Sequence, residues 1–516
     1  MVARRPLWRR VLRWLALGFA GVIVLGLGAL TIAYFRSSNA CDGPKAAPAH
    51  PMKAIVYCEY GKADVLRLED VEQPVPADDQ VLVKVRAASV NPFDWHFMRG
   101  TPYLMRLDAG LRYPKSTRLG VDFAGTVEAV GKNVTGLKVG DDVFGARSGA
   151  FAEYVVVRED RVALKPAVLS FEQAAAIPIA AVTALQGLRD GGKLQAGQKV
   201  LINGASGGVG TFAVQIAREL GAQVTGVCST RNLEMVRALG ADQVIDYTKE
   251  DFTKSAERYD VILDNVGNRA LLDCRRVLTP KGHFVLIGGG GPDAGSWIGP
   301  LAGPLKALVL SRFVSQDMGM FLANVNKDDL AVLADLMQGG KVTPVIDRRY
   351  PLSETAKAIE YLEQGHARGK VVLTLGWGPP VDADRLKDLA TRYTAAWCSQ
   401  NAASVAAFYA ENGSLTINEG APAVGLKAVT EAAQGFMTAF PDMAVAMDGA
   451  EVEGNHAIYR WTLTGTNTGP GGTGKAVHII GHEEWTIGPD GLIAASKGHF
   501  DEAEYQRQLK AEAGGR

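Results

Sequence analysis

The alternation of hydrophobic and polar positions changes several times along the chain, and each change marks a different kind of element. Between Trp14 and Phe35 every residue is uncharged. A helix needs about 20 apolar residues to cross a bilayer, so this stretch predicts one transmembrane helix. From Met52 onward, short runs such as KAIVY and QVLVKVRAASV are separated by Gly, Pro and Asp. Runs of this kind predict a β-rich domain of short strands.

After about Leu169, strand-like and helix-like segments alternate, which predicts a parallel sheet with crossover helices. Residues 376–382 are rich in Gly and Pro and are interpreted as a linker. Residues 383–410 then have apolar positions three or four apart, as a helix requires. The last part contains the strand-like runs HAIYRWTLTGT, AVHIIGHEEWTIG and LIAASKGHFD. Helices followed by an antiparallel sheet predict an α+β fold.

The charges around the first apolar stretch favour one orientation in a membrane. Five arginines precede it, whereas only Arg36 and Lys45 follow closely. The positive-inside rule then places the N-terminus in the cytoplasm and the body outside. We therefore expect a single-pass membrane protein that contacts the lipid bilayer through residues 14–35. Three alternatives are open: a signal peptide cleaved near residues 38–40, a twin-arginine export signal at residues 9–10, and a lipoprotein anchor at Cys41.

Composition and charge indicate a globular protein without a nucleic-acid partner. Hydrophobic residues make up 47% and charged residues 21% of the chain, with 59 Gly, which excludes disordered, collagen-like and coiled-coil classes. Residues 1–51 hold seven basic groups and one acidic group, so the remainder carries 48 basic and 54 acidic residues. Its net charge of −6 argues against binding to nucleic acid.

Five cysteines occur singly, and no two of them form a CxxC pair. This spacing predicts isolated structural or surface thiols, and neither a zinc knuckle nor a disulfide framework. The cysteines are at positions 41, 58, 228, 274 and 398.

A glycine-rich turn at residues 203–210 (NGASGGVG) provides the strongest chemical signal. It follows a buried-strand run at 199–202 and precedes a helix, and a second strand at 223–228 comes within about 30 residues, as a dinucleotide-binding unit requires. Glycines permit a tight turn and close approach of the backbone to a pyrophosphate at the helix N-terminus. The cofactor-binding residues predicted in this turn are Ala205, Ser206, Gly207, Gly208, Val209 and Gly210.

The end of the second strand favours NADP(H) over NAD(H). An acidic residue there would bind the ribose 2′-hydroxyl and repel a 2′-phosphate. The chain instead has Ser229, Thr230 and Arg231, whose hydroxyl groups and guanidinium suit a phosphate. The alternative is that Arg231 is a solvated residue in the first turn of a helix.

Eight further segments follow one another along the chain: 89–94 (SVNPFD), 119–125 (LGVDFAG), 139–145 (VGDDVFG), 149–154 (GAFAEY), 177–184, 229–231 (STR), 264–267 (DNVG) and 369–373 (GKVVL). Through these segments, residues 52–375 resemble a medium-chain dehydrogenase/reductase of the zinc-free quinone oxidoreductase branch. The resemblance implies a GroES-like domain and a Rossmann domain, and it covers about 320 residues in order.

The departures from the family's zinc enzymes imply chemistry without a metal. Asn91 stands where zinc alcohol dehydrogenases have a cysteine, and residues 120–122 (GVD) stand where they have Gly-His-Glu. The four-cysteine structural lobe is missing. Catalytic zinc needs three good protein ligands, so we expect no metal and predict hydride reduction of a quinone or an α,β-unsaturated carbonyl compound.

The same resemblance implies roles for individual residues. Asn91 and Thr183 are placed near the nicotinamide as the catalytic candidates. Tyr247 is placed either against the 2′-phosphate or as a cap of the third strand. Asn265 and Val266 complete the predicted cofactor-binding set.

The C-terminal part contains the segments 408–413 (FYAENG), 425–429 (GLKAV), 440–442 (FPD) and 498–501 (GHFD). Through them it resembles the SnoaL-like group of the NTF2-like fold, an α+β cone. Members of this group are cyclases, isomerases, or binding and dimerisation modules. The residues predicted for a C-terminal pocket are His482, Glu484, His499 and Asp501. Their alternative interpretation is as surface polar groups of a binding or assembly module.

These segments predict the following organisation: 1–36 anchor or signal, 37–51 linker, 52–175 GroES-like domain, 176–320 Rossmann NADP-binding domain, 321–375 return completing the reductase, 376–382 linker, and 383–510 SnoaL-like domain. We expect a membrane-tethered, homodimeric NADPH-dependent reductase with a C-terminal domain that binds a small ligand. The alternatives are a bifunctional reductase plus cyclase or isomerase, and a non-catalytic NADPH-binding sensor. The side of the membrane is open, because the charge bias places the body outside whereas NADPH is supplied in the cytoplasm.

Overall fold

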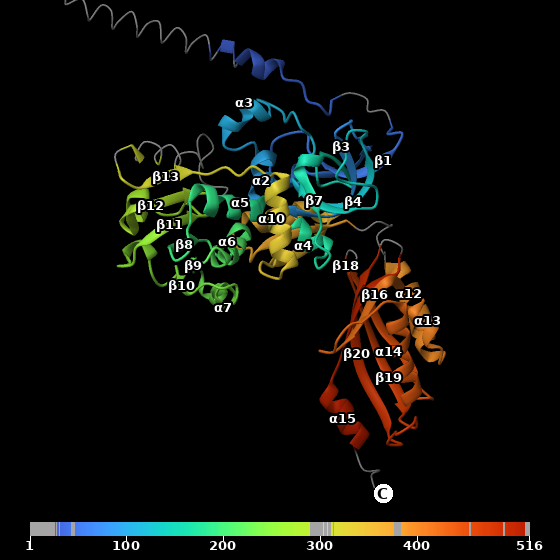
Figure 1. Ribbon diagram of the computed structural model, residues 1–516. Helices are drawn as coiled ribbons and strands as arrows, with labels where there is room; N and C mark the ends of the chain where they lie inside the picture. Colours follow the sequence, from blue (N-terminus) through green and yellow to red (C-terminus); the bar gives the residue numbers. More distant parts are fainter. Residues whose placement is uncertain are drawn as a thin grey trace, which may run out of the picture. The chain divides into compact units, whose positions relative to one another are not determined.

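The chain folds into two compact units, Met1–Leu375 and Gly376–Arg516, drawn in the computed structural model of Figure 1. The structure describes residues 26, 28–29, 31–42, 47–288, 303, 307, 311–312, 314–375, 383–453, 456–488 and 491–510.

The structure corrects the predicted membrane localisation. Within the ranges just given, no helix is both long enough and apolar enough to cross a bilayer. A helix that spans a bilayer needs about 20 continuous apolar residues. The prediction of a single-pass membrane protein is therefore wrong. Residues 14–25 of the expected span lie outside the described residues.

The β-rich part of the first unit is a seven-stranded sheet. Its strand order is β14-β15-β3-β4-β5-β7, with β6 paired to β3, and β1 and β2 form a separate antiparallel pair. The strands are β1 (Pro51–Val56), β2 (Arg67–Glu72), β3 (Gln80–Val90), β4 (Asp122–Val130), β5 (Asp142–Ala146), β6 (Tyr154–Arg158), β7 (Val162–Leu164), β14 (Ile346–Pro351) and β15 (Lys370–Thr374).

The last strand of the first unit returns to the first sheet. β15 pairs antiparallel with β3, so that Val371 lies opposite Val90. Both strands are rich in valine; all five residues of β15 and eight of the eleven residues of β3 are buried. This pairing brings the start of β15 next to the end of β3, where the chain enters helix α2 (Pro92–Arg99).

The second sheet confirms the predicted doubly wound fold. Its six strands are parallel in the order β10-β9-β8-β11-β12-β13, so the order reverses between β8 and β11. Ligands of such sheets bind at this switch point, beyond the carboxyl ends of the strands. The strands are β8 (Lys199–Asn203), β9 (Gln223–Cys228), β10 (Gln243–Asp246), β11 (Tyr259–Asp264), β12 (Leu278–Leu286) and β13 (Asp317–Met320).

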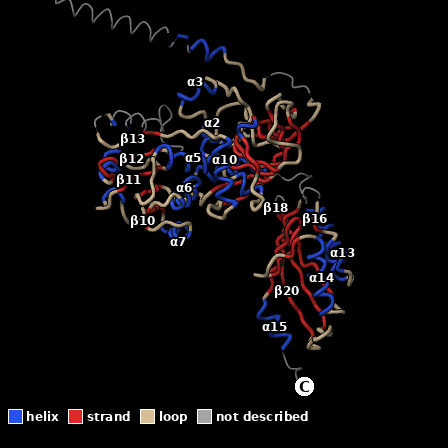
Figure 2. The backbone as a smooth tube through the Cα atoms, in the orientation of Figure 1, coloured by secondary structure: helices blue, strands red, loops and turns tan. Residues whose placement is uncertain are grey.

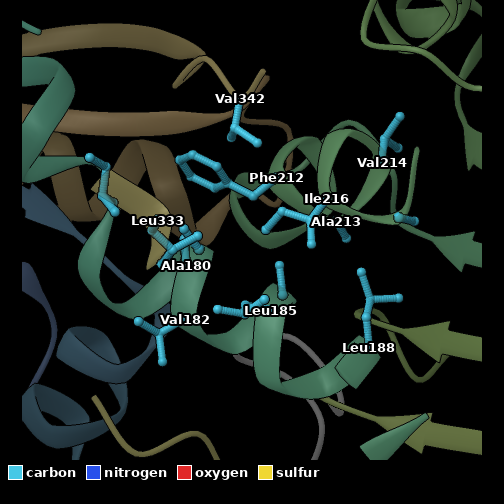
Figure 3. Packing of buried hydrophobic residues seen from close by; sticks show 14 of the residues in the cluster. Ala180, Val182, Leu185, Leu188, Phe212, Ala213, Val214, Ile216, Leu333 and Val342 are labelled. Atoms are coloured by element: carbon cyan, nitrogen blue, oxygen red, sulfur yellow. The ribbon is translucent and has the colours of Figure 1, made fainter. Parts of the chain in front are cut away.

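Helices α5 (Pro178–Gln186), α6 (Gly208–Glu219) and α10 (Lys327–Gln338) contribute to one core of buried side chains. Figure 3 shows Leu185 of α5 near Ala213 and Ile216 of α6. Small residues on α5 allow the two helices to approach closely, which fixes the beginning of α6 against the sheet. Other α-helices of this unit are α3 (Arg106–Ala109), α4 (Phe171–Ala175), α7 (Leu233–Ala238), α8 (Leu271–Arg276) and α11 (Thr355–Glu363).

The second unit is an α+β domain, as predicted, but its sheet is mixed and not wholly antiparallel, because β16 pairs parallel with β21. Its six strands run in the order β17-β16-β21-β20-β19-β18, and Figure 2 shows α13 and α14 beside these strands. The elements are α12 (Ala383–Cys398), α13 (Ala402–Ala406), β16 (Tyr409–Ile417), β17 (Ala423–Val424), α14 (Leu426–Ala439), β18 (Ala444–Glu453), β19 (His456–Thr466), β20 (Ala476–Ile487), β21 (Ile493–Phe500) and α15 (Glu502–Lys510).

The structure also corrects the prediction that all cysteines are isolated. Cys41 and Cys58 form a disulfide, with Cα atoms 5.7 Å apart. Cys58 follows β1, and Cys41 lies in the predicted linker, so the bond ties this linker to the β-rich part. Their separation of 17 residues is not a motif spacing, and the pairing depends on how the linker folds back. Cys228, Cys274 and Cys398 are free thiols.

Candidate functional site

The glycine-rich turn lies at the switch point of the parallel sheet. β8 ends at Asn203, and α6 begins at Gly208. Gly204 has φ +78°, in the left-handed region that favours glycine. A Cβ atom at Gly210 would lie 2.0 Å from the Gly204 carbonyl oxygen. The turn therefore requires glycine at both positions, and it exposes backbone N–H groups at the start of α6, where a pyrophosphate fits.

A hydrogen-bonded asparagine joins this turn to the end of β9. Asn232 Nδ2 donates to Ser206 Oγ at 3.0 Å and to Ser229 Oγ at 3.2 Å. The Oδ1 atom of Asn232 is buried without a hydrogen-bond partner, and so is Oδ1 of Asn265. A buried amide oxygen without a donor is costly. These unsatisfied acceptors, together with the glycine turn, fit a nicotinamide dinucleotide between β8, β9 and β11.

The predicted phosphate-binding residues lie around the end of β9, but their side chains differ in exposure and in hydrogen-bond partners. Arg231 is exposed, and its Nη2 donates to the carbonyl oxygen of His366 at 2.6 Å. Thr230 Oγ1 instead donates to Asp246 Oδ2 at 2.6 Å. The hydrogen bonds from Thr230 and Thr248 lower the pKa of Asp246 to about 2. The Tyr247 side chain is 47% exposed, so it is accessible to a cofactor.

A buried polar network connects the β-rich part with this turn. Lys370 Nζ donates to Asn91 Oδ1 at 2.5 Å and lies 3.4 Å from Asp122 Oδ2. Asn91 Nδ2 donates to the same carboxylate oxygen at 2.9 Å. Ser89 Oγ donates to it as well, at 3.0 Å. The four side chains are at most 3% exposed, so the charged pair is compensated by hydrogen bonds as burial demands.

The network touches the glycine-rich turn directly. Gly369 N donates to the Ser206 carbonyl oxygen at 2.9 Å. A Cβ atom added at Gly208 would lie only 3.1 Å from Lys370 Cδ. Lys370 therefore contacts the first residue of α6 while its ammonium group is held by Asn91. Sequence reasoning missed this lysine, although it belongs to the GKVVL segment that carried the family resemblance.

Asp122 also fixes the helix that carries Thr183. The backbone N–H of Ile179 donates to Asp122 Oδ1 at 3.0 Å, at the beginning of α5. Thr183 lies one turn further along and is 7% exposed. The predicted catalytic residues Asn91 and Thr183 are thus linked through one carboxylate. Val266, by contrast, lies beyond β11. A Cβ atom added at Gly204 would lie 2.7 Å from Val266 Cγ2.

Asp94 is a second buried carboxylate beside this network. Its Oδ2 accepts from the backbone N–H of Asn91 at 2.7 Å and caps α2. Its Oδ1 is buried without a hydrogen-bond partner. Burial, aided by the nearby charge of Asp122, raises the pKa of Asp94 to about 8 against the lowering effects of the Asn91 N–H and the Lys370 charge. Burial also raises the pKa of Asp122 and lowers that of Lys370.

The residues at the positions of the zinc ligands do not fit a zinc ion. Asn91 offers an amide, and its oxygen accepts from Lys370. Asp122 is the one carboxylate there, and the same ammonium group lies beside it. A divalent cation within reach of these atoms would meet the positive charge of Lys370, and it would lack the three ligands that catalytic zinc needs.

The second unit has a different buried carboxylate, at Glu483 on β20. Its Oε2 accepts hydrogen bonds from Tyr393 Oη at 3.1 Å, Trp485 Nε1 at 2.8 Å and Ser496 Oγ at 2.6 Å. Burial raises the pKa of Glu483 against the lowering effect of these donors. Glu483 lines an apolar cavity of about 60 Å³ together with Trp397, Tyr459, Trp461 and other side chains.

The predicted C-terminal residues lie outside this cavity. Successive side chains of a strand point to opposite faces, so His482 and Glu484 point away from the cavity that Glu483 lines. His499 lies opposite His482 on β21, and these three residues cluster. Asp501 Oδ1 instead accepts from the backbone N–H of Glu504 at 2.9 Å and begins α15. The sequence could have identified Glu483, because its odd-numbered position places it on the same strand face as the apolar Val477, Ile479, Trp485 and Ile487.

Three family models match separate segments of the chain. A model described as the alcohol dehydrogenase GroES-like domain matches residues 77–167, and one described as zinc-binding dehydrogenase matches residues 239–373. A model described as SnoaL-like polyketide cyclase matches residues 387–509.

Similar proteins match the larger part of the chain. A 2-methylene-furan-3-one reductase from Solanum lycopersicum is 38% identical over 337 residues, which are 62% of this chain and 79% of that protein. A quinone oxidoreductase from Sus scrofa is 35% identical over 63% of this chain and 98% of its own length. The solved structure of the quinone oxidoreductase from Coxiella burnetii has a TM-score of 0.56 and 32% identity, and the match covers 63% of this chain and 99% of that one.

Proposed function

Because this chain belongs to the medium-chain dehydrogenase/reductase family and carries a SnoaL-like domain, we propose that it is a zinc-independent reductase that uses NADPH. Oxidoreductase activity with a nicotinamide cofactor follows from the family. The substrate class that we propose is a quinone or an α,β-unsaturated carbonyl compound. Relatives named 2-methylene-furan-3-one reductase, NADPH-dependent alkenal/one oxidoreductase and quinone oxidoreductase support this choice.

The observation that carries the proposal is the contact of Lys370 with Asn91 and Asp122. The ammonium group contacts Asn91 and Asp122, the two residues that stand at metal-ligand positions of the family's zinc enzymes. Oxidation of a simple alcohol relies on a metal that acidifies the hydroxyl group. Reduction of a conjugated acceptor does not, since the acceptor is already electron-poor. A site built without metal ligands thus favours the reductive direction.

Each part of the site has a separate task in this proposal. NADPH supplies the hydride when it is bound. The backbone at Gly204–Gly210 receives its pyrophosphate, and Ser229 and Arg231 receive its 2′-phosphate. Both ends of the Asn91 amide are occupied within the protein. We therefore assign Asn91 a positioning role, in which it holds Lys370 against the start of α6.

The experiment that tests the proposal is NADPH oxidation by the full chain, followed by absorbance at about 340 nm, where the reduced nicotinamide ring absorbs. A panel of quinones and enones is compared with simple ketones, and NADH is assayed in parallel. We expect turnover with conjugated acceptors and little with the ketones. NADPH binding without turnover on any acceptor would favour the alternative of a sensor.

For the second unit we propose that a small ligand binds at Glu483. The support is a protonatable carboxyl group that faces an apolar cavity and is held by Tyr393, Trp485 and Ser496. A carboxyl group in such surroundings can exchange a proton with a bound carbonyl compound. The cavity of about 60 Å³ accommodates only a few heavy atoms, so a larger ligand requires the cavity to open. Glu483→Gln tests this role, because it keeps the shape and removes the titrating group.

A further inference from the structure

The outer face of the second unit's sheet carries a cluster of two imidazoles and one carboxylate. His482, Glu484 and His499 each offer one ligand atom, and these atoms all lie within 4.8 Å of one another. The His499 Nε2 and Glu484 Oε1 atoms are 4.0 Å apart. The cluster lies on the strand face opposite to Glu483, so it does not belong to the inner cavity.

The sheet itself fixes these three side chains. His482 and Glu484 are two residues apart on β20 and therefore share one face. His499 is the direct cross-strand neighbour of His482, and the two rings stack with centroids 4.9 Å apart. Antiparallel neighbours are held at a nearly constant spacing by backbone hydrogen bonds. A ligand set anchored on two paired strands is thus pre-arranged before an ion binds.

The charged side chains around the cluster are compatible with a bound cation. Arg460 is the neighbour of His482 on β19, and its Nη2 lies 3.6 Å from Glu451. Lys497 is the neighbour of Glu484 on β21 and is exposed. Asp448 and Asp501 line the same hollow, whose volume is about 640 Å³. Glu419 and Glu502 line the hollow as well, so the acidic side chains outnumber Arg460 and Lys497 there, and the hollow gives solvent access.

The ligand types select a class of ion. Imidazole nitrogen suits zinc, copper, nickel and iron, whereas calcium and magnesium prefer all-oxygen sites. Two histidines and one carboxylate, with one position left for water, are also the ligand number of catalytic zinc sites.

We propose that His482, Glu484 and His499 form a binding site for one divalent transition-metal ion, with water at the open position. The site uses Nδ1 or Nε2 of each histidine and one oxygen of Glu484. It is separate from the zinc positions of the family's alcohol dehydrogenases, which this chain replaces with Asn91 and Asp122. Each histidine would bind the ion through the lone pair of a neutral imidazole nitrogen.

The test is a titration of the chelator-treated full chain with Zn²⁺ by calorimetry, and with Co²⁺ by visible absorption. We expect one equivalent of tightly bound ion and a Co²⁺ ligand-field spectrum. His482→Ala and His499→Ala are each expected to weaken binding at least about tenfold, since each removes one of three ligands. Glu484→Gln keeps the shape of the side chain and is expected to weaken binding as well.

The matched control is His478→Ala, because His478 is exposed on the same strand, four residues from His482. Its hydrogen bonds to Gln508 are made by backbone atoms, so the variant keeps them. Cys398→Ser removes the exposed thiol as a competing ligand. Circular dichroism verifies that each variant is folded. Absence of stoichiometric binding, or binding that His482→Ala and His478→Ala weaken equally, would overturn the proposal.

Discussion

The ammonium nitrogen of Lys370 lies 2.5 Å from the amide oxygen of Asn91, although the two residues are 279 positions apart in the chain. The contact joins the start of β15 to the end of β3. It also connects the predicted catalytic asparagine with the glycine-rich turn, because Lys370 Cδ packs beside Gly208. A displacement of the cofactor turn is thereby coupled to Asn91 through one side chain.

Lys370→Met is expected to destabilise the first unit and to lower turnover. The variant leaves the Asp122 carboxylate buried without its counter-charge, and breaking a buried ion pair costs about 3–5 kcal/mol. Denaturant unfolding measures the free energy of unfolding, and NADPH oxidation measures kcat. Lys341→Met is the matched control, since Lys341 pairs with Glu219 at the surface and such pairs contribute about 0–1 kcal/mol.

The double variant Asp122→Asn, Lys370→Met separates charge from packing. Removing both charges takes away the uncompensated carboxylate, so we expect part of the lost stability to return. kcat is expected to stay low, because Asn91 still lacks its partner. If Lys370→Met alone were as stable and as active as the parent, the network would have no role in the site.

Asp94 is expected to make stability depend on pH. Its pKa in the folded chain is raised to about 8, above the unfolded value of 3.8. The protonated carboxyl group therefore stabilises the folded state fully below about pH 4, and this contribution is lost as the pH rises through about 8. Asp94→Asn removes the titration, so its stability relative to the parent is expected to increase from pH 5 to pH 8. Thermal unfolding at several pH values measures this.

The control for Asp94 is Asp108→Asn, an exposed residue of α3. We expect the difference between this variant and the parent to stay constant over the same pH range. A constant difference for Asp94→Asn as well would show that Asp94 is ionised throughout.

Arg231→Ala is expected to raise KM for NADPH by about tenfold or more and to leave KM for NADH nearly unchanged. The reason is that the guanidinium group would bind a phosphate that NADH lacks. Steady-state kinetics with both cofactors measure the ratio. Arg237→Ala, an exposed arginine of α7, controls for a general loss of positive charge. Equal effects of Arg231→Ala on both cofactors would remove the phosphate-binding role.

The doubly wound sheet and its cofactor turn could be predicted because their signals are local. Strand, glycine turn and helix follow one another between residues 199 and 219, and backbone sterics dictate glycine there. Lys370 could not be found this way, since Asp122 lies 248 positions away. No period or spacing relates residues that meet only when β15 pairs with β3 and β3 pairs with β4.

The C-terminal residues illustrate a different limit. Because side chains alternate between the two faces of β20, His482 and Glu484 lie on the face opposite to Glu483. The alternation does not indicate which of the two faces is buried. Ile480 is apolar yet 65% exposed, which obscures the pattern. The covered face is identified by Trp485 and its apolar neighbours of the same parity. His482 and Glu484, which were selected for their chemistry, thus lie on the outer face of the sheet. The buried carboxylate of Glu483 lies among the apolar positions of the inner face.

The Cys41–Cys58 disulfide determines which cysteines we expect a thiol reagent to modify. In the unreduced native chain, a thiol reagent is expected to modify Cys398 rapidly, because it is the exposed free cysteine. Cys228 and Cys274 are buried, and burial raises the pKa of their thiols to about 11 and about 12, so little thiolate is present to react. Mild reduction is then expected to add Cys41 and Cys58 to the labelled set. Peptide mass mapping before and after reduction identifies each site, and Cys41→Ser serves as control because it leaves Cys58 reactive without reduction. Labelling of both Cys41 and Cys58 in the unreduced native chain would contradict the disulfide.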